Sequence, residues 1–533
     1  MTINKARQKP VAEGHQNFMG GVSHMVKNPI LQLRLVASSA FFGQKMYYSE
    51  ESNAHQRLRK VFNLMDGNDP LGDYLRETLG QALPFPNHRH MSPTQLIESA
   101  ISAALDFDPE ATLAEAVRLR NEDNIRDTPQ VIMVMAAHHP KVRGTGLIKQ
   151  YADMILVRTD DAITQLAYQM TVYGRPIPNA LKKAWKRFIE GRNAYQLAKY
   201  RMESRKFKLV DLVNLVRANN PHIDQLMRGE LKLDGDTWES IISAEGPSQA
   251  SWTKAVEKMG HMGLLRNLRN LAQHNVAPSL YLSKLTETVK DGKQLPFRYY
   301  SAFKSIEDGL EGGNASKGQI LDALETCLVS SLDEMPRFQG RVMSLCDNSG
   351  SAQSAMPSDM SEMRINQIAN LTGVLTGMTA DEGFVGVFGD RLEVVPVRKQ
   401  ASVFDQTRYI DQIGNNIGLG TEHGIWLFFD QAIQKKEHWD HIFVYSDMQA
   451  GHGGLYGLDG EYRDFRWEGS NHIDVAKLIK IYRKKVNPNV QVYLVQMAGY
   501  PDSLVPEYYD KTYILGGWGS GLLKFAHHLS TVG

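Results

Sequence analysis

The chain contains little cysteine: Cys327 and Cys346 are the only two in 533 residues, and neither belongs to a CxxC motif. Two cysteines cannot build a disulfide framework, which excludes the disulfide-rich secreted class and favours a reducing compartment. The sequence also lacks an apolar run of about 18 residues, and its polar start, MTINKARQKPVAEGHQN, lacks the apolar segment of a signal peptide. We therefore expect a cytoplasmic protein with no membrane partner.

Net charge is nearly absent as well, at +1, but the charges are unevenly distributed along the chain. Residues 341–533 hold 17 Lys and Arg against 22 Asp and Glu, whereas residues 1–340 hold 43 against 37. This asymmetry indicates a basic N-terminal part and an acidic C-terminal part with different roles. The length agrees with several domains.

Motifs of nucleotide binding and of common hydrolases are missing too. The sequence contains no GxxxxGK[ST], GxGxxG, GxSxG or HExxH pattern. Neighbouring histidines lack metal-ligand context, so we interpret them as surface or core histidines: His88, His90, His138, His139, His527 and His528. We expect no catalysis; the alternative is hydrolysis at a metal pair on Asp347 and Asp447.

Helix-forming patterns dominate from about residue 70 to 305, after an extended arm at residues 1–30. Three predicted helix starts place a capping residue before proline, at Ser92-Pro93, Asp108-Pro109 and Thr128-Pro129. Apolar residues then recur at helical spacing. Short helices paired in series predict an α-solenoid of the HEAT kind, although the sequence shows no strict period.

The pattern changes after a glycine-rich junction around residues 306–340, because strand-like runs then alternate with helical ones. The expected strands are Arg341–Cys346, Phe384–Phe388, Leu392–Val397, His441–Ser446, Val490–Gln496 and Thr512–Leu515. The expected helices lie near residues 363–378, 422–435 and 472–484, with a last one from Ser520. This alternation predicts a mostly parallel sheet covered by helices on both faces. The predicted domains are an arm (1–30), a helical module (31–335) and an α/β domain (336–533).

Small oxygen-bearing side chains follow the first of these strands, in the segment DNSGS. Asp347, Ser349 and Ser351 stand at alternate positions, and hard oxygen donors suit Mg²⁺ or Mn²⁺. Thr421 and Asp447 follow later elements, and ligands of such sheets bind at the carboxyl ends of strands. All five residues match the metal-ion-dependent adhesion site of von Willebrand factor A domains. We predict a divalent-cation site here; a plain turn is the alternative.

A strongly basic stretch, LKKAWKRFIEGRNAYQLAKYRMESRKFK, lies in the helical part. Only Glu190 and Glu203 oppose its cations, and aromatic residues are interleaved with them. A strip of this kind is typical of a surface that phosphates approach. We predict RNA contacts by Lys182, Lys183, Lys186, Arg187, Arg192, Lys199, Arg201, Arg205, Lys206 and Lys208. The alternative is an ordinary solvated helix face.

A second cluster, MGLLRNLRNLAQHN, combines a leucine stripe with Arg266 and Arg269 on another face. The leucines indicate a core helix. The two arginines either line an RNA-binding groove or are simply exposed, and both interpretations remain open at this point.

Several segments together resemble the Ro autoantigen family, whose module is called TROVE. The similar segments, in chain order, are FFGQKMYYSEES, YGRPIPNALKKAWKRF, LAKYRMESRKFKLVDLVNLVRANNP, MGLLRNLRNLA and LPFRYYSAFKSI. The metal-site pattern then follows in the family's order, so the resemblance extends over essentially the whole chain. By position, Lys199, Arg201 and Arg205 match or adjoin family cations, and Arg266 matches another.

The resemblance implies a ring of HEAT-like helices bridged by a von Willebrand factor A-like domain. It also implies Y RNA on the outer basic surface and single-stranded 3′ ends of misfolded RNAs in a central hole. A cooperating exoribonuclease of the polynucleotide phosphorylase type is implied, tethered by the Y RNA. One departure is that the family's RNA-contacting histidine is missing near Leu209. Asn348, inside the DNSGS segment, is given no role.

A different class of function remains as the alternative. In it the metal site docks a protein partner, and the basic face has only incidental RNA affinity.

Overall fold

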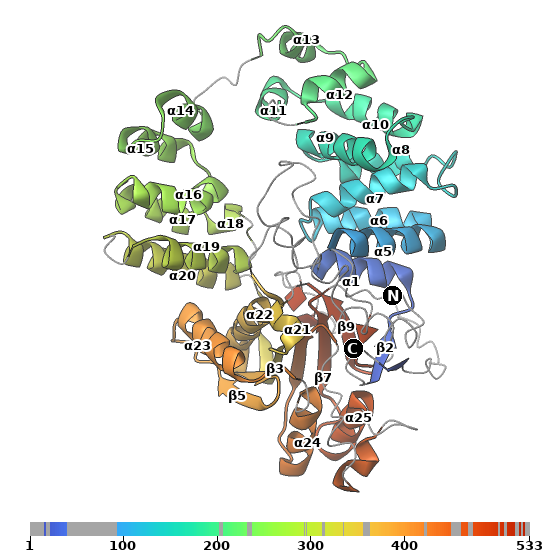
Figure 1. Cartoon of the computed structure of the whole chain (residues 1–533), viewed down its shortest axis with the longest axis vertical. Helices are drawn as coiled ribbons and strands as arrows, with labels where there is room; N and C mark the ends of the chain where they lie inside the picture. The colour runs from blue at the N-terminus through green and yellow to red at the C-terminus, as the bar shows by residue number, and fades with distance from the viewer. Residues whose placement is uncertain are drawn as a thin grey trace, which may run out of the picture.

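Two columns of helices stand over a six-stranded sheet in the computed structural model of this chain (Figure 1). The structure describes residues 15–16, 22–39, 93–201, 206–231, 237–292, 294, 296–311, 315–333, 335–354, 363–420, 424–448, 460–466, 473–498, 502–505, 509–517, 522–523 and 526–527. Two short strands, β1 (His15–Gln16) and β2 (Val22–Met25), lie in the predicted extended arm.

The first column is built from the N-terminal helices. In chain order it contains α1 (Pro29–Ser39), α5 (Pro93–Phe107), α6 (Pro109–Asn121), α7 (Asp127–His138), α8 (Leu147–Ile155), α9 (Thr159–Tyr168), the π-helix η2 (Gln169–Tyr173), α10 (Asn179–Glu190), α11 (Ala194–Lys199), α12 (Leu209–Val216) and α13 (Pro221–Met227). The predicted cap Asp108 accepts a hydrogen bond from the Ala111 amide at 3.0 Å. The predicted cap at Thr128 is wrong, because α7 begins at Asp127 after Arg126.

The second column continues along the other side of Figure 1. It contains α14 (Trp238–Glu245), α15 (Gln249–Lys258), α16 (His261–Gln273), the 3-10 helix η3 (Pro278–Leu280), α17 (Leu282–Glu287), α18 (Val289–Gly292), α19 (Pro296–Gly309) and α20 (Lys317–Leu332). The mostly helical character predicted for this half of the chain is confirmed.

The sheet follows the second column, and its strand order is β5-β4-β3-β6-β7-β9. The strands are β3 (Phe338–Asp347), β4 (Ala380–Phe388), β5 (Leu392–Pro396), β6 (His441–Ser446), β7 (Gln491–Gln496) and β9 (Thr512–Gly516). Neighbours are parallel except β5, which is antiparallel to β4. The predicted mostly parallel sheet is therefore confirmed.

Helices cover both faces of the sheet, as predicted. One face packs on α22 (Ile365–Thr379) and α23 (Val403–Asn416), and the other on α24 (Ile425–Lys435) and α25 (Val475–Lys485). The short α21 (Gly350–Ser354) follows β3. The sequence analysis missed α23, and the helix expected from Ser520 falls largely outside the described residues.

The hydrophobic cores do not group the two helical columns together, although these columns are consecutive in the chain. The first column has a core of its own, which runs from Leu33 to Leu231. The core that begins at Trp252 in the second column continues through α22 and α23 to Ala526, at the end of the α/β domain. We call the second column and the α/β domain together the joint body.

The first column reaches the α/β domain through its N-terminal end. Strand β2 pairs antiparallel with β8 (Asp502–Ser503), and α1 lies against β9. The backbones come close there, because a Cβ on Gly516 would lie 2.9 Å from the Leu35 Cα. Among the described residues, no helix combines the length and apolarity needed to span a bilayer.

Candidate metal centre and basic surface

The predicted metal ligands converge at one edge of the sheet. Asp347 is the last residue of β3, and Asp447 directly follows β6, the parallel neighbour of β3. Because Cys346 pairs in register with Tyr445, the two aspartates leave adjacent strand ends together. The side chains of Asp347 and Asp447 are almost wholly buried, with 0% and 2% of their surface exposed.

Short contacts organise the oxygen atoms around Asp347. Its Oδ1 accepts a hydrogen bond from the Ser349 amide at 2.9 Å, and its Oδ2 accepts one from the Ser446 hydroxyl at 2.5 Å. The hydroxyl oxygens of Ser349 and Ser351 lie 3.2 Å apart. Burial, followed by the negative charge of Asp447, raises the pKa of Asp347 to about 7. A bound cation would relieve this cost of holding negative charge in a buried site.

The donor set fits a hard divalent cation. Two carboxylates and two serine hydroxyls are oxygen ligands of the kind that Mg²⁺ and Mn²⁺ prefer. The described residues include no group of three His, Cys, Asp or Glu side chains suited to a metal, so hydroxyls must complete the set. Thr421 lies outside the described residues. Ser446 is an additional nearby hydroxyl that the sequence analysis missed, although it stands directly before Asp447.

Asn348 turns out to have a structural role, contrary to the sequence analysis. Its side chain is fully buried and forms a reciprocal amide pair with Asn370, with hydrogen bonds of 2.9 and 3.1 Å. Its Oδ1 also accepts a hydrogen bond from Asn366 at 3.1 Å. A metal-loop residue that binds no cation therefore fixes the loop onto α22.

The same network reaches the second column. Asn370 donates to the Asp411 carboxylate on α23 at 2.8 Å, and the Tyr300 hydroxyl on α19 donates to that carboxylate at 2.8 Å. These side chains are buried, where satisfied hydrogen bonds favour one arrangement of the elements. A series of side-chain hydrogen bonds thus links the predicted metal loop to α19 of the second column.

The predicted basic surface begins on α10, which is strongly amphipathic. Leu181, Trp185 and Ile189 are buried, while Lys183 and Arg187 are exposed. Arg187 forms an ion pair with Asp153 at 2.9 Å, and Lys186 lies 3.8 Å from Glu190. Such exposed pairs contribute little to stability, so these cations remain accessible to a polyanion. Lys182 is partly buried on the same helix.

Aromatic rings accompany the cations that follow α10. The Arg192 guanidinium lies over the Phe188 ring, 4.2 Å from its centre. The Lys199 ammonium lies 5.6 Å from the ring centre of Tyr195 and 5.7 Å from that of Tyr200. These distances are typical of cation–π contacts, which hold the cations at the surface.

The remaining predicted RNA-binding residues are placed less uniformly. Arg201 donates a hydrogen bond to the Leu231 carbonyl at 3.0 Å and so ties two parts of the first column together. Lys206 is exposed and Lys208 is half-buried, whereas Arg205 lies outside the described residues.

Arg266 and Arg269 are exposed on α16, whose leucine stripe is buried as predicted. Helix α16 belongs to the second column, on the other side of the molecule from α10 (Figure 1). Arg269 rests against Gly309 of α19, where a Cβ would be 3.4 Å from the guanidinium carbon. The structure therefore separates these arginines from the basic stretch.

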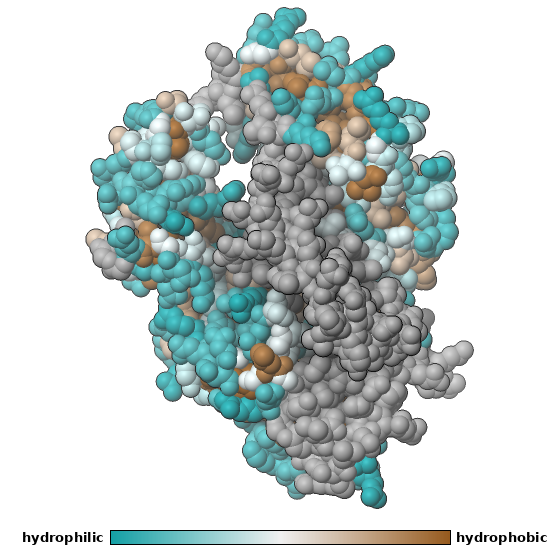
Figure 2. All heavy atoms as spheres, in the orientation of Figure 1, coloured by the Kyte–Doolittle hydropathy of each residue, from teal (hydrophilic) through white to brown (hydrophobic). Residues whose placement is uncertain are grey.

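The outer surface of this face is largely hydrophilic. Figure 2 shows hydrophilic residues over most of both columns, with apolar residues in separate patches. The exposed apolar and aromatic side chains include Tyr173, Tyr195 and Leu280.

Comparison with known proteins finds one family model that matches part of the chain. Residues 227–322 match the family model of the TROVE domain, which covers most of the second column. A search of curated proteins gives no match.

A solved structure matches almost the whole chain. It is the crystal structure of the Ro (RSR) protein of Deinococcus radiodurans, with a TM-score of 0.54 and 12% sequence identity. The match covers 94% of this chain and 99% of that one, so it shows a shared fold over both columns and the α/β domain.

Proposed function

Since this chain carries a TROVE domain and has the fold of a bacterial Ro protein, we propose that it is an RNA-binding protein of the Ro type without catalysis of its own. The observation that carries the proposal is this family match in a molecule with a basic, aromatic-lined helical surface. RNA recognised by shape requires phosphate contacts, and lysine and arginine supply them without reading bases.

The basic surface of α10 is the proposed binding site for structured RNA of the Y RNA type. Lys182, Lys183 and Lys186 contribute charge there, on a helix whose other face is buried. Arg201 contributes mainly by fixing the backbone, because its guanidinium is used on Leu231.

Single-stranded 3′ ends of misfolded RNA are proposed to enter between the two columns. In this proposal the columns are HEAT-like repeats that form a ring with the von Willebrand factor A-like domain, and a folded RNA body is too wide for it. An exoribonuclease of the polynucleotide phosphorylase type, tethered by the bound RNA in the cytoplasm, would then act on the threaded end.

The α/β domain is proposed to bind one Mg²⁺ or Mn²⁺. Asp347, Ser349, Ser351 and Asp447 would hold the cation, together with Thr421 as predicted from the sequence. The cation would supply positive charge at the carboxyl edge of the sheet, where it would attract a carboxylate of a partner protein. The buried carboxylate pair supports this assignment.

An RNA-binding experiment tests the proposal. A fluorescent hairpin RNA with a single-stranded 3′ tail is titrated with the protein across a salt series, and affinity should fall steeply with salt. The variant Lys182→Gln/Lys183→Gln/Lys186→Gln should lower the slope of log affinity against log salt by about 2–3. Lys254→Gln/Lys435→Gln, which removes exposed lysines of the joint body, is the control. Wild-type protein that ignores this RNA at low salt would overturn the proposal.

Protein docking at the metal site is the second candidate function, and the buried pair Asp347 and Asp447 favours it. It predicts partner capture that depends on the cation, and RNA affinity that the triple lysine variant leaves unchanged. Cleavage of the hairpin RNA by pure protein with Mg²⁺ would instead indicate a nuclease.

A further inference from the structure

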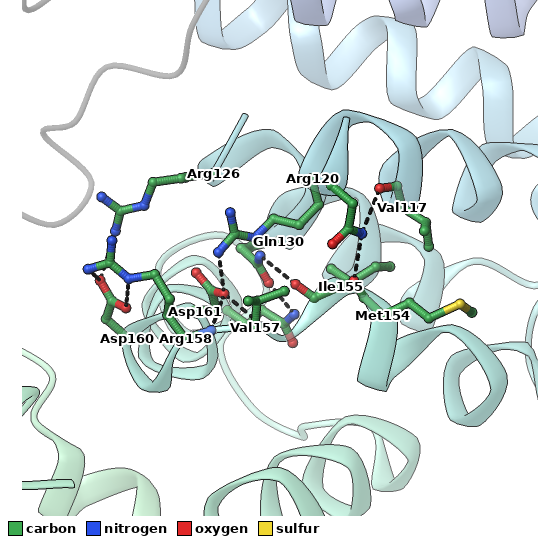
Figure 3. Close-up of polar contacts among 12 residues, drawn as sticks. Val117, Arg120, Arg126, Gln130, Met154, Ile155, Val157, Arg158, Asp160 and Asp161 are labelled. Atoms are coloured by element: carbon green, nitrogen blue, oxygen red, sulfur yellow. Dashed lines mark hydrogen bonds and ion pairs between the residues drawn. The ribbon is translucent and has the colours of Figure 1, made fainter. Parts of the chain in front are cut away.

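Two arginines outside the basic stretch converge on one carboxylate in the first column. Arg126 stands directly before α7 and Arg158 directly before α9, and both side chains reach Asp160 (Figure 3). The Arg126 Nη2 lies 2.8 Å from Asp160 Oδ2. The Arg158 Nε and Nη2 lie 3.0 and 3.2 Å from the two oxygens of the same carboxylate. One aspartate therefore fixes two guanidinium groups side by side.

Both guanidinium groups remain accessible from solvent. The side chain of Arg126 is 44% exposed and that of Arg158 is 38% exposed, whereas Asp160 is 11% exposed. The carboxylate is thus beneath the two cations, and among the described contacts Arg126 uses only its Nη2. The other guanidinium donors of Arg126 are directed to no described protein group.

The arginine pair continues into the cations of α11. The Arg158 guanidinium lies 5.1 Å from the centre of the Tyr200 ring, and the Lys199 ammonium lies 5.7 Å from the same ring. Arg192 approaches the carbonyl of Val157, the neighbour of Arg158, at 3.5 Å. Residues from α7, α9 and α11 that are far apart in the sequence therefore form one positive surface.

The neighbouring acids offset part of this positive charge. Burial raises the pKa of Asp127, next to Arg126, to about 6, and the charge of Arg126 opposes this rise. Asp161 is buried and forms an ion pair with Arg120 at 3.0 Å, and it accepts hydrogen bonds from the Val157 and Arg158 amides. Asp160 is the acid that accepts hydrogen bonds from both Arg126 and Arg158. Lys199 and Arg192 contact aromatic rings rather than carboxylates among the described residues.

We propose that Arg126, Arg158 and Lys199 form a phosphate-binding site for single-stranded RNA, with a base stacked on Tyr195. The proposal rests on the proposed RNA-binding function and adds to it two arginines that lie outside the basic stretch, beside Lys199 and Tyr195 of α11. Planar guanidinium groups bind phosphate oxygens in pairs, and here Asp160 holds them in position before the ligand arrives.

Tyr195 is the reason to favour a single strand over a duplex. Its side chain is 56% exposed, and the Lys199 ammonium lies 3.5 Å from its hydroxyl. An exposed ring beside cations offers a stacking surface to an unpaired base, which a base pair inside a helix cannot use. Because stacking and phosphate contacts read no base edges, the site should show little sequence preference.

Two fluorescent probes test the site: a 12-nucleotide single-stranded oligouridine and a blunt hairpin RNA. With Arg126→Gln, affinity for the oligouridine should fall about tenfold, and its salt slope should decrease by about 0.7. Tyr195→Ala should lower the affinity for the oligouridine by a similar factor and change the affinity for the hairpin much less. Arg126→Lys keeps the charge but should recover only part of the affinity, because an ammonium cannot bind two oxygens in a planar fork.

Controls separate this site from the proposed function and from loss of folding. Lys254→Gln, on an exposed lysine of the second column, should bind both probes as wild type does. The thermal midpoint of Arg126→Gln should stay close to the wild-type value, since Arg126 is only half-buried and Arg158 still pairs with Asp160. If Lys182→Gln/Lys183→Gln/Lys186→Gln loses affinity while Arg126→Gln and Tyr195→Ala bind oligouridine normally, the site is wrong and the function stands. If wild-type protein binds neither probe, the proposed function itself is wrong.

Discussion

The two helical columns differ in how they are joined to the rest of the molecule. The second column shares one hydrophobic core with the α/β domain, whereas the first column encloses a core of its own. The comparison indicates two cooperative units, the joint body and the first column. Two helical columns of similar architecture are therefore coupled differently to the α/β domain.

Contacts at the two junctions explain this difference. Between the second column and α23, the rings of Phe303 and Phe404 pack at a tilt of 36° with their centres 4.1 Å apart. Glu325 accepts hydrogen bonds from the first amides of α23. The first column meets the α/β domain through the short β2–β8 ladder and the close approach of α1 to Gly516. A side-chain core therefore joins one column, while mainly backbone contacts join the other.

The segment that matches the TROVE family model lies in the joint body and hardly extends into the first column. Residues 227–322 lie almost entirely in the second column, while the basic stretch lies in the first. Buried positions that pack on another domain are restricted in volume and shape. Exposed cations are less restricted, because a phosphate can be reached from several neighbouring positions.

The largest predicted effect is a loss of stability in the joint body that the first column does not share. Phe303→Ala should lower the free energy of unfolding of the joint body by about 4 kcal/mol, since it leaves a cavity at a fully packed junction. Hydrogen exchange followed by mass spectrometry should then show faster exchange in the second column and the α/β domain together. Exchange in α6–α10 should remain at the wild-type rate.

Leu181→Ala is the matched variant in the other core, because Leu181 is fully buried on α10. It should destabilise the first column by about 2–5 kcal/mol and leave exchange in β3, β6 and β7 unchanged. If either variant accelerates exchange equally in both units, the molecule unfolds as one and the division is wrong.

Cation binding should also distinguish the two units, because the candidate metal site lies in the joint body. Mg²⁺ or Mn²⁺ at 100 times its dissociation constant should stabilise the joint body by about 2.7 kcal/mol. The expected result is a higher thermal midpoint for that unit only, measured by calorimetry with and without the cation. Asp347→Asn should abolish the shift, and an equal shift in this variant would place the cation elsewhere.

The sequence predicted the regular elements of the α/β domain because their buried positions are apolar and their boundaries are marked. It missed α23 because two of the buried positions in that helix are Thr407 and Asp411, which interrupt the apolar pattern. Asp411 is buried to accept hydrogen bonds from Tyr300 and Asn370. A residue whose partners are distant in sequence gives no local signal.

The candidate sites could likewise be predicted only where their residues are close in sequence. The segment containing Asp347 was recognisable because its donors are close in sequence, whereas Asn348 forms its contacts through α22. Arg126 and Arg158 stand among acidic residues, so their segments show no excess of positive charge. Only the fold brings them together with Lys199.

A smaller effect should come from the backbone junction of the first column. Gly516→Ala would place a Cβ 2.9 Å from the Leu35 Cα and 3.0 Å from its carbonyl oxygen, so α1 must move. We expect a loss of about 2 kcal/mol, the middle of the range for overpacked positions, and faster exchange in α1. Gly318→Ala is the control, since a Cβ on Gly318 of α20 would meet nothing within 4 Å.

The smallest predicted effect is the contribution of one histidine to the pH dependence of the joint body. Burial lowers the pKa of His441, at the start of β6, to about 4, while the unfolded chain keeps an ordinary value near 6.5. The unfolded state therefore binds the proton first as the pH falls below about 6.5, and stability is lost progressively down to about pH 4. Between pH 7 and 5 the loss should be about 1 kcal/mol, allowing for the partial exposure of the ring. Because the raised pKa of Asp347 acts in the opposite direction over this range, the test compares His441→Gln with the unmutated histidine on the Asp347→Asn background by urea unfolding. His441→Gln should remove this pH dependence and His222→Gln on α13 should retain it; an unchanged dependence in His441→Gln would place the proton elsewhere.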